Sequence, residues 1–302
     1  MKVSRIGSVR CKLGEGPLWD VEEQALYFVD VLGNKLWRYK EAGDTFESWG
    51  FETSISSLAL AKDGGAIVSL QSGFHHFDFT SGKTTFISNP TKDNPTTQLN
   101  DGKVDARGRF IVGSVDISMA TNAGLFSLAP DLSVTQLDDN LQITNGPCWS
   151  PDQKTLYLAN SLTHNIYAYD YDLETGLVSN RRTFTNTADS GLGGIPDGAT
   201  VDTQGRLWTA MCDGAKIACF DTQGQLVQAI DFPTGQVSSV MFGGRNLDRL
   251  YVTSIDAGAL ASIKAAEGAV YGPDEIGGGL FVIDGLEAKG LPEHRFGTIT
   301  PT

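Results

Sequence analysis

The sequence is poor in cysteine and has no long apolar segment. Only 4 of its 302 residues are cysteine, and no two of them form a CxxC pair. This usage is not that of a disulfide-stabilised domain and favours free thiols in a reducing compartment. No stretch approaches the roughly 18 consecutive apolar residues of a membrane span, and the basic N-terminal residues contain no apolar signal-peptide core. These absences predict a cytoplasmic protein without a membrane partner.

Positive charge is also scarce. The chain carries 23 Lys and Arg against 36 Asp and Glu, a net charge of −13. Such a surface repels phosphate backbones, so we expect no nucleic-acid partner. The apolar fraction of 40% is that of an ordinary globular protein with a sizeable core.

Several catalytic motifs are missing. No GxSxG segment is present, which disfavours a serine hydrolase. The 4 histidines lack the spacing of a metalloprotease, and the TSGKTT segment at 80–85 lacks the first glycine of a phosphate-binding loop. The chemistry must therefore come from another set of residues.

A repeat of forty to fifty residues runs through the chain. Its marker is an aspartate that precedes a short run rich in β-branched and aromatic residues, such as ALYFVD or TLYLAN. A second alternating run follows each of them, such as KLWRYK or NIYAYDY, and turn-forming residues separate the runs. The markers are Asp20, Asp63, Asp105, Asp152, Asp202 and Asp248.

This period, with several β-runs per unit and hardly any helical periodicity, is typical of a propeller blade of four antiparallel strands. Six units predict an all-β, six-bladed β-propeller that forms a single domain over residues 1–302. A β-sandwich would not explain the long repeat. We expect the N-terminal run VSRIGSV to supply the outer strand of the last blade and close the ring.

The start of each repeat carries a variable polar residue within a related phrase, as in GEGPLWD, LNDGKVD, TNGPCWSPD and PDGATVD. In a propeller this residue enters the innermost strand, so the equivalent side chains converge on the axis. Taken singly, dipeptides such as Asn-Gly and Asp-Gly are ordinary turn formers. Together, two carboxylates, two amides and two hydroxyls form a ring of oxygen donors that suggests a divalent cation. These positions are Glu15, Ser57, Asn100, Asn145, Asp197 and Ser239.

The ends of the second strands return to the same face. They place polar residues near its rim, where they would contact the substrate or cap the strand ends. These residues are Asp30, Ser114, Asn160 and Ser254.

The segments GEGPLW, NDGKVD, TNGPCWSPD and PDGATVD, in this order, resemble those of the gluconolactonase and regucalcin family of six-bladed propellers. The resemblance covers nearly the whole chain. It implies one divalent metal ion held by Glu15, Asn145 and Asp197, and it implies that Asn100 contacts the substrate or a water on the metal. Asp197 would double as the general base. The ion is Ca²⁺, Zn²⁺, Mn²⁺, Mg²⁺ or Fe²⁺, since all of them accept oxygen ligands.

Two positions depart from the animal members of this family. Gln98 stands where they carry an arginine, and Ser118, with Asp116 nearby, stands where they carry a glutamate. The sugar specificity of those members therefore does not transfer, and the chain is more similar to bacterial sugar lactonases.

The function that we expect is metal-dependent hydrolysis of a sugar lactone, either an aldonolactone or a sugar-acid lactone. Asp197 would move the proton, or the metal alone would activate the water, while Asn100 and Gln98 would orient the sugar hydroxyls. The alternatives are a phosphotriesterase-like metal hydrolase and a non-catalytic calcium-binding protein. The segments 89–98 and 255–278 would act as specificity loops or as ordinary exposed loops.

Overall fold

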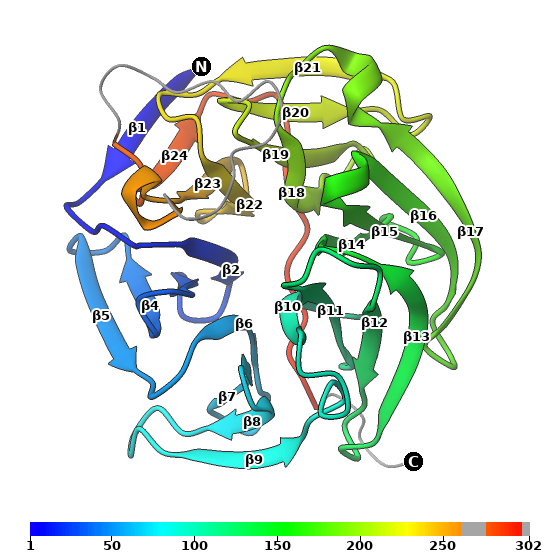
Figure 1. Ribbon diagram of the computed structural model, residues 1–302. Coiled ribbons are helices and arrows are strands. Elements are labelled where there is room, and N and C mark those ends of the chain that lie inside the picture. The colour runs from blue at the N-terminus through cyan, green and yellow to red at the C-terminus, as the bar shows by residue number, and fades with distance from the viewer. Residues whose placement is uncertain (261–275, 298–302) are drawn as a thin grey trace.

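Six four-stranded antiparallel sheets surround a central axis in the computed structural model, which describes residues 1–260 and 276–297 (Figure 1). The prediction of a six-bladed β-propeller with four antiparallel strands per blade is confirmed. Within each sheet the strands follow one another outwards from the axis.

The first three blades follow one another in chain order. Blade 1 contains β2 (Gly14–Asp20), β3 (Ala25–Asp30), β4 (Lys35–Lys40) and β5 (Thr45–Gly50). Blade 2 contains β6 (Ile55–Leu60), β7 (Ala66–Leu70), β8 (Gly73–Phe77) and β9 (Thr84–Ser88). Blade 3 contains β10 (Thr97–Val104), β11 (Phe110–Asp116), β12 (Ala123–Leu128) and β13 (Val134–Leu141).

The last three blades complete the ring. Blade 4 contains β14 (Thr144–Trp149), β15 (Thr155–Asn160), β16 (Asn165–Asp172) and β17 (Leu177–Asn186). Blade 5 contains β18 (Ile195–Val201), β19 (Leu207–Cys212), β20 (Lys216–Phe220) and β21 (Leu226–Asp231). Blade 6 contains β22 (Val237–Gly243), β23 (Arg249–Ser254), β24 (Leu280–Asp284) and, as its outer strand, β1 (Lys2–Ile6).

The N-terminal strand closes the ring as predicted. β1 pairs with β24 in antiparallel register from Lys2 opposite Asp284 to Ile6 opposite Leu280. The first strand of the chain and the last strand of blade 6 in chain order, β24, therefore share one sheet, which covers the edge that the last blade would otherwise expose.

In the part of the chain that the structure describes, helical structure is limited to three short 3-10 turns, η1 (Ser161–Thr163), η2 (Thr187–Ser190) and η3 (Ala257–Leu260). No helix in residues 1–260 and 276–297 is long and apolar enough to cross a membrane.

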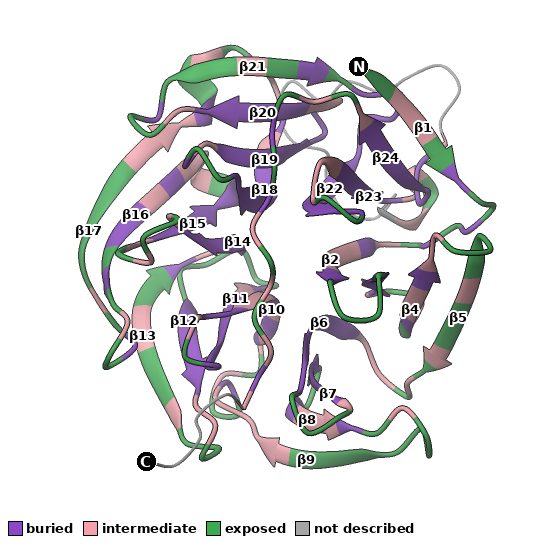
Figure 2. Ribbon diagram, turned by 180° about the vertical axis from the view of Figure 1, so that it is seen from behind, coloured by how far each residue is buried: buried purple, intermediate pink, exposed green. Residues whose placement is uncertain are grey.

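The core lies between neighbouring sheets. Trp19 of blade 1 stacks on Tyr251 of blade 6 with ring centroids 5.4 Å apart, and Trp208 of blade 5 meets Phe242 of blade 6 edge-on at 5.9 Å. The inner three strands of most blades are buried, whereas the outer strands β5, β13, β17 and β21 are largely exposed (Figure 2). Since each sheet buries its faces only against its neighbours, the ring must be complete for the core to form.

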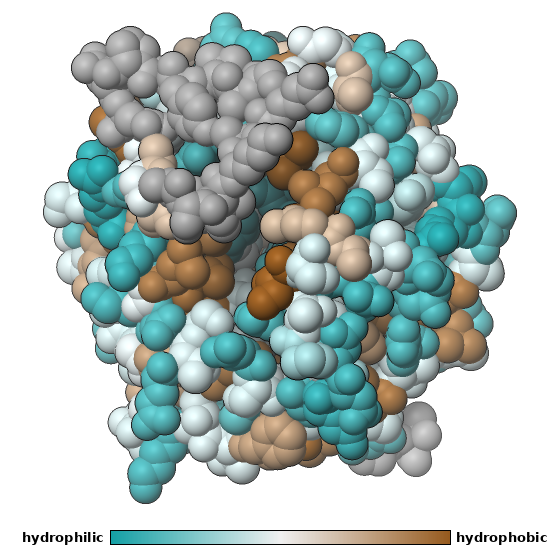
Figure 3. Space-filling view, viewed as in Figure 1, coloured by the Kyte–Doolittle hydropathy of each residue, from teal (hydrophilic) through white to brown (hydrophobic). Residues whose placement is uncertain are grey.

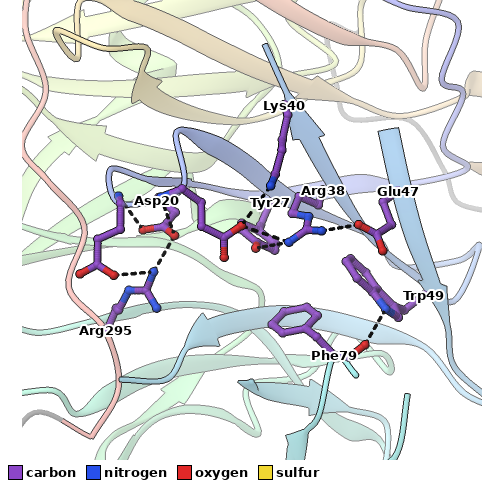
Figure 4. A network of polar contacts seen from close by, with 10 residues as sticks. Asp20, Tyr27, Arg38, Lys40, Glu47, Trp49, Phe79 and Arg295 are labelled. Atoms are coloured by element: carbon purple, nitrogen blue, oxygen red, sulfur yellow. Dashed lines mark hydrogen bonds and ion pairs between the residues drawn. The ribbon is translucent and has the colours of Figure 1, made fainter. Parts of the chain in front are cut away.

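A C-terminal segment after β24 crosses the propeller on the face where the inner strands end (Figures 1 and 2). We call residues 286–297 the C-terminal strap. Its backbone bonds to several blades: Lys289 O accepts from Thr203 N at 2.8 Å, and Phe296 N donates to Leu60 O at 2.8 Å. Arg295 pairs with Asp20 at 2.6 Å and with Glu22 at 3.2 Å (Figure 4). The strap therefore ties blades on opposite sides of the axis together.

The polar residues at the ends of the second strands act as caps. Asp30 accepts hydrogen bonds from Lys12 N, Leu13 N and Gly33 N, and Asn160 Oδ1 accepts from Gln142 N at 3.1 Å. Ser114 and Ser254 donate to backbone carbonyls within their own blades. Of the two roles considered for these residues, these contacts support the capping role.

Candidate functional site

Every inner strand contains a β-bulge at the variable polar position of the repeat. In blade 1, Glu15 is opposite Val29 whereas Leu18 is opposite Tyr27, so the inner strand has one residue more than its partner. The same extra residue occurs in the other five blades, between Leu99 and Gly102 in blade 3 and between Asn145 and Cys148 in blade 4, for example. A bulge re-aims the side chains beside it, which explains how these positions face the axis.

Two glycines let the inner strands approach one another at these bulges. Gly146 has φ +58, and a Cβ there would lie 2.7 Å from both the Cβ and the N of Ala199 in the next blade. A Cβ on Gly198 would lie 1.9 Å from Ser239 Oγ. The glycine of the repeated phrase thus serves close packing around the axis as well as the turn.

The asparagines predicted from the sequence meet directly. Asn100 Nδ2 donates to Asn145 Oδ1 at 2.7 Å and to Thr144 O at 3.0 Å. Asn145 Nδ2 in turn donates to Ser161 Oγ at 3.0 Å. In this orientation of the amide, the Asn145 oxygen faces Asn100 and its nitrogen faces Ser161.

Three carboxyl groups lie close together at the axis, Glu15, Asp197 and Asp101. Withdrawal from water raises the pKa of Glu15 well above its ordinary value, and the neighbouring Asp197 and Asp101 raise it further. Burial, followed by the charge of Asp101, likewise raises the pKa of Asp197, against hydrogen bonds from Gly198 N and the Cys212 thiol. Like charges held this close do not all ionise unless a cation compensates them.

Asp101 is the acidic residue of this cluster that sequence reasoning missed. Its Oδ2 accepts from Gly146 N at 2.8 Å and its Oδ1 from Gly102 N at 2.8 Å, and only 8% of the residue is exposed. Burial raises its pKa, while these N–H groups and the charge of Lys103 act in the opposite direction. In the sequence, Asp101-Gly102 is an ordinary turn dipeptide, and regular strand alternation would point Asp101 away from Asn100.

Two further partners of the site were also missed, Ser161 and Cys212. Ser161 holds the Asn145 amide from the 3-10 turn after β15. The Cys212 thiol donates to Asp197, and burial together with the charges of Asp197, Asp213 and Glu15 raises the thiol pKa well above its ordinary value. Both lie at the end of a second strand, and no motif in the sequence marks them.

No basic side chain pairs with Glu15, Asp101 or Asp197 among the ion pairs of the described residues. The donors that converge are carboxylate and amide oxygens, which suit hard divalent cations. Within residues 1–260 and 276–297, no group of three or more His, Cys, Asp or Glu side chains is arranged as a metal site, and the candidate set depends on the amide of Asn145.

The residues predicted to contact a substrate differ in whether they bond to the cluster. Gln98 and Asn100 lie two positions apart on β10 and are both half-buried, but Gln98 makes no hydrogen bond to the cluster within the described chain. Asp116 is buried and accepts from the N–H and hydroxyl of Ser118 and from Asn122, so it shapes the loop after β11. Burial is the largest single influence on the pKa of Asp116 and raises it. The hydrogen bonds together outweigh burial and lower this pKa to about 2.

The face on which the inner strands begin is hollowed at its centre (Figure 3). Exposed apolar side chains stand on loops of this face, at Leu32, Ile117, Met119 and Leu162. Of the segment 89–98, residues 89–96 form a turn-rich connection between β9 and β10, and the last two residues begin β10. Most of the other expected specificity loop, 255–278, lies outside the described residues, at positions 261–275.

Comparison with known proteins identifies relatives of this chain by sequence and by structure. A family model described as SMP-30/Gluconolactonase/LRE-like region matches residues 13–256. Regucalcin from Gallus gallus is 34% identical over 303 residues, which cover 98% of both chains. A solved luciferin-regenerating enzyme is 30% identical, with a TM-score of 0.88 over 98% of this chain and 99% of that one. A gluconolactonase from Xanthomonas campestris, 21% identical with a TM-score of 0.74 over 93% and 88%, shares the fold.

Proposed function

Because this chain belongs to the SMP-30/gluconolactonase/LRE-like family, we propose that it is a divalent-metal-dependent hydrolase that opens the ester ring of a sugar lactone to the free acid. The observation that carries the proposal is the cluster of Glu15, Asp101 and Asp197 at the axis, beside the paired amides of Asn100 and Asn145. Among the described residues no ion pair neutralises these carboxyl groups, and burying them together is costly unless they serve a cation.

The residues present fit a divalent cation. Glu15, Asp197 and the Oδ1 atom of Asn145 would hold it, and Ca²⁺, Mg²⁺, Mn²⁺, Zn²⁺ or Fe²⁺ would be accepted by such oxygen donors. When bound, the ion would polarise the ester carbonyl as a Lewis acid. Three protein ligands leave room for a substrate, which favours catalysis over a purely structural role.

The protein's own residues would position the reactants. Ser161 and Asn100 fix the Asn145 amide from both sides, so its oxygen keeps one direction. Asp197, whose carboxyl is buried and hydrogen-bonded by Cys212, would accept the proton of the attacking water. The half-buried Asn100 and Gln98 on β10 would contact the sugar hydroxyls.

The test is acid release from a panel of lactones. Chelator-stripped protein is mixed with glucono-, xylono-, galactono-, arabinono- and aldaro-lactones, with and without each of the five cations, and the pH is followed. We expect one cation to restore hydrolysis of at least one lactone. Absence of hydrolysis for every combination, on protein that binds the cation, would overturn the proposal.

That negative outcome would favour a second candidate function, calcium binding without turnover. The name regucalcin, carried by the Gallus gallus relative, and the oxygen-only donor set both favour it. Under this function calcium would bind tightly to the stripped protein, and lactone hydrolysis would stay at the rate of the uncatalysed control.

A further inference from the structure

A small cavity lies on the axis below the candidate metal site, on the side of the C-terminal strap. Its volume is about 20 Å³, enough for one water molecule. Asp101, from the carboxyl cluster, lines it together with Lys103 and with Glu293 of the strap. The cavity therefore connects the acidic cluster on one side of the propeller with the strap that crosses the other.

Lys103 is a cationic group that acts on this cluster. It lies on β10, two residues after Asp101, and its Nζ is 3.3 Å from Glu293 Oε1 and 3.4 Å from Ala199 O. The Lys103 and Glu293 side chains are only 15% and 12% exposed. Burial alone would lower the pKa of Lys103, but Glu293, Cys148 and Asp101 raise it above its ordinary value, so the ammonium group stays charged.

The charges along the axis form a continuous series. Asp101 interacts electrostatically with Glu15, Asp197, Lys103 and Glu293. Because water is largely excluded, the charge on each group acts on its neighbours more strongly than it would at the surface. One lysine among four carboxyl groups therefore affects how strongly the cluster attracts a cation, and Glu293 offsets part of that effect.

We propose that Lys103 and Glu293 form a charge-balancing pair that sets how tightly the candidate site binds a divalent cation. The proposal rests on the metal site of the proposed function, and it makes both residues positioning groups that never touch the ion. Glu293 partly neutralises the ammonium group, which would otherwise repel the cation. Since Glu293 belongs to the C-terminal strap, the strap contributes to the site from the opposite face.

The strap is held firmly enough to deliver Glu293 to this position. Arg295, two residues later, pairs with the buried Asp20 (Figure 4). Phe296 exchanges backbone hydrogen bonds with Leu60 and Lys62. On the other side of Glu293, Gly290 N donates to Leu247 O at 2.8 Å. Anchors on both sides leave Glu293 little freedom to leave Lys103.

The experiment measures Mn²⁺ and Ca²⁺ binding to chelator-stripped full-length protein by titration calorimetry. Glu293→Gln should weaken binding about tenfold, because the lysine charge then acts on the site without compensation. The double variant Lys103→Met with Glu293→Gln removes both charges and should return the affinity to within about twofold of the wild type. Glu287→Gln, the same change at an exposed position of the strap, should leave the affinity unchanged.

The outcomes separate this proposal from the one on which it rests. A wild-type protein that binds neither cation overturns the metal site itself. A wild type that binds, together with unchanged binding in Glu293→Gln or uncorrected binding in the double variant, overturns the charge-balancing pair alone. Circular dichroism verifies folding, and if Met at position 103 is not tolerated, Lys103→Gln in the same background makes the same change of charge.

Discussion

At the scale of single residues, the site contains acidic side chains that work against the stability of the fold. Burial and the neighbouring carboxyl groups raise the pKa of both Glu15 and Asp197, and within the described residues no ion pair compensates them. Residues selected for binding commonly lower stability in this way, and replacing them often stabilises the protein. The two roles that these positions can have, ligand or turn former, therefore predict opposite changes in stability.

Glu15→Gln and Asp197→Asn should each abolish metal-dependent hydrolysis and weaken metal binding at least about a hundredfold, because an amide is a poorer ligand than a carboxylate. In chelator, each variant should unfold at the same temperature as the wild type or about 2 °C higher, since one repelling charge is gone. Calorimetry and thermal unfolding measure the two effects.

Asp131→Asn, in an exposed turn, is the control for these variants. It should change neither the affinity for the metal nor the unfolding temperature. A large loss of stability in Glu15→Gln or Asp197→Asn without metal would mean that they are structural turn residues, and it would contradict their assignment as ligands.

How far the site could be predicted from the sequence depends on how each residue is placed. Glu15, Asn145 and Asp197 occupy one position of a repeat, so the symmetry of the ring brings them to the axis. Asp101, Ser161 and Cys212 join the cluster through a bulge or the end of a second strand, and the spacing in the sequence encodes neither. The repeat therefore identifies the proposed ligands but not the partners that hold them.

At the scale of elements, strands were easier to predict than the register between them. The runs ALYFVD and TLYLAN coincide with β3 and β15, because alternating β-branched and aromatic residues define a strand locally. The bulges depend on two strands at once, so no local pattern reveals them.

The bulge in blade 4 allows a test of how much the close packing between the inner strands of neighbouring blades contributes to the stability of the protein. Gly146→Ala should destabilise the protein by about 3 kcal/mol, because it combines an unfavourable positive φ with a clash against Ala199. It should also weaken metal binding, since Asn145 would shift. Unfolding in urea gives the free energy.

Gly82→Ala is the matched control for this variant, because Gly82 has φ +68 in the turn before β9 and a Cβ there would meet nothing within 4 Å. Gly82→Ala should lower the free energy of unfolding by about 1 kcal/mol, because it introduces only the unfavourable positive φ and no clash. Equal losses in the two variants would show that the approach between blades contributes nothing.

At the scale of the whole molecule, the ring and the strap bring distant parts of the sequence to one axis. β1 and β24 share a sheet, and Glu293 meets Lys103 across 190 positions of the chain. The repeat predicted the closure of the ring, because a missing fourth strand must come from the other terminus. The strap lies outside the repeat, so no pattern in the sequence predicts that it reaches the axis.

The acidic cluster also makes the stability of the whole protein depend on pH in a direction opposite to that of most carboxyl groups. The pKa values of Glu15, Asp101 and Asp197 are raised in the folded state, whereas in the unfolded chain they are ordinary, about 4. At pH values between the unfolded-state and the folded-state pKa, the folded protein binds more protons than the unfolded chain. The free energy of unfolding therefore falls as pH rises. This contribution is fully present below about pH 4 and is lost as the pH rises through the folded-state values.

A bound divalent cation would replace the protons on these carboxyl groups, and it would remove the loss of stability that their ionisation causes at higher pH. We therefore expect the rise in unfolding temperature on adding metal to be larger at pH 8 than at pH 6, measured by calorimetry against protein kept in chelator. In the double variant Glu15→Gln with Asp197→Asn, this difference between the two pH values should nearly vanish, because two of the three interacting carboxyl groups are gone. An equal rise at both pH values in the wild type would mean that the cation binds elsewhere and leaves the protons of the axial cluster in place.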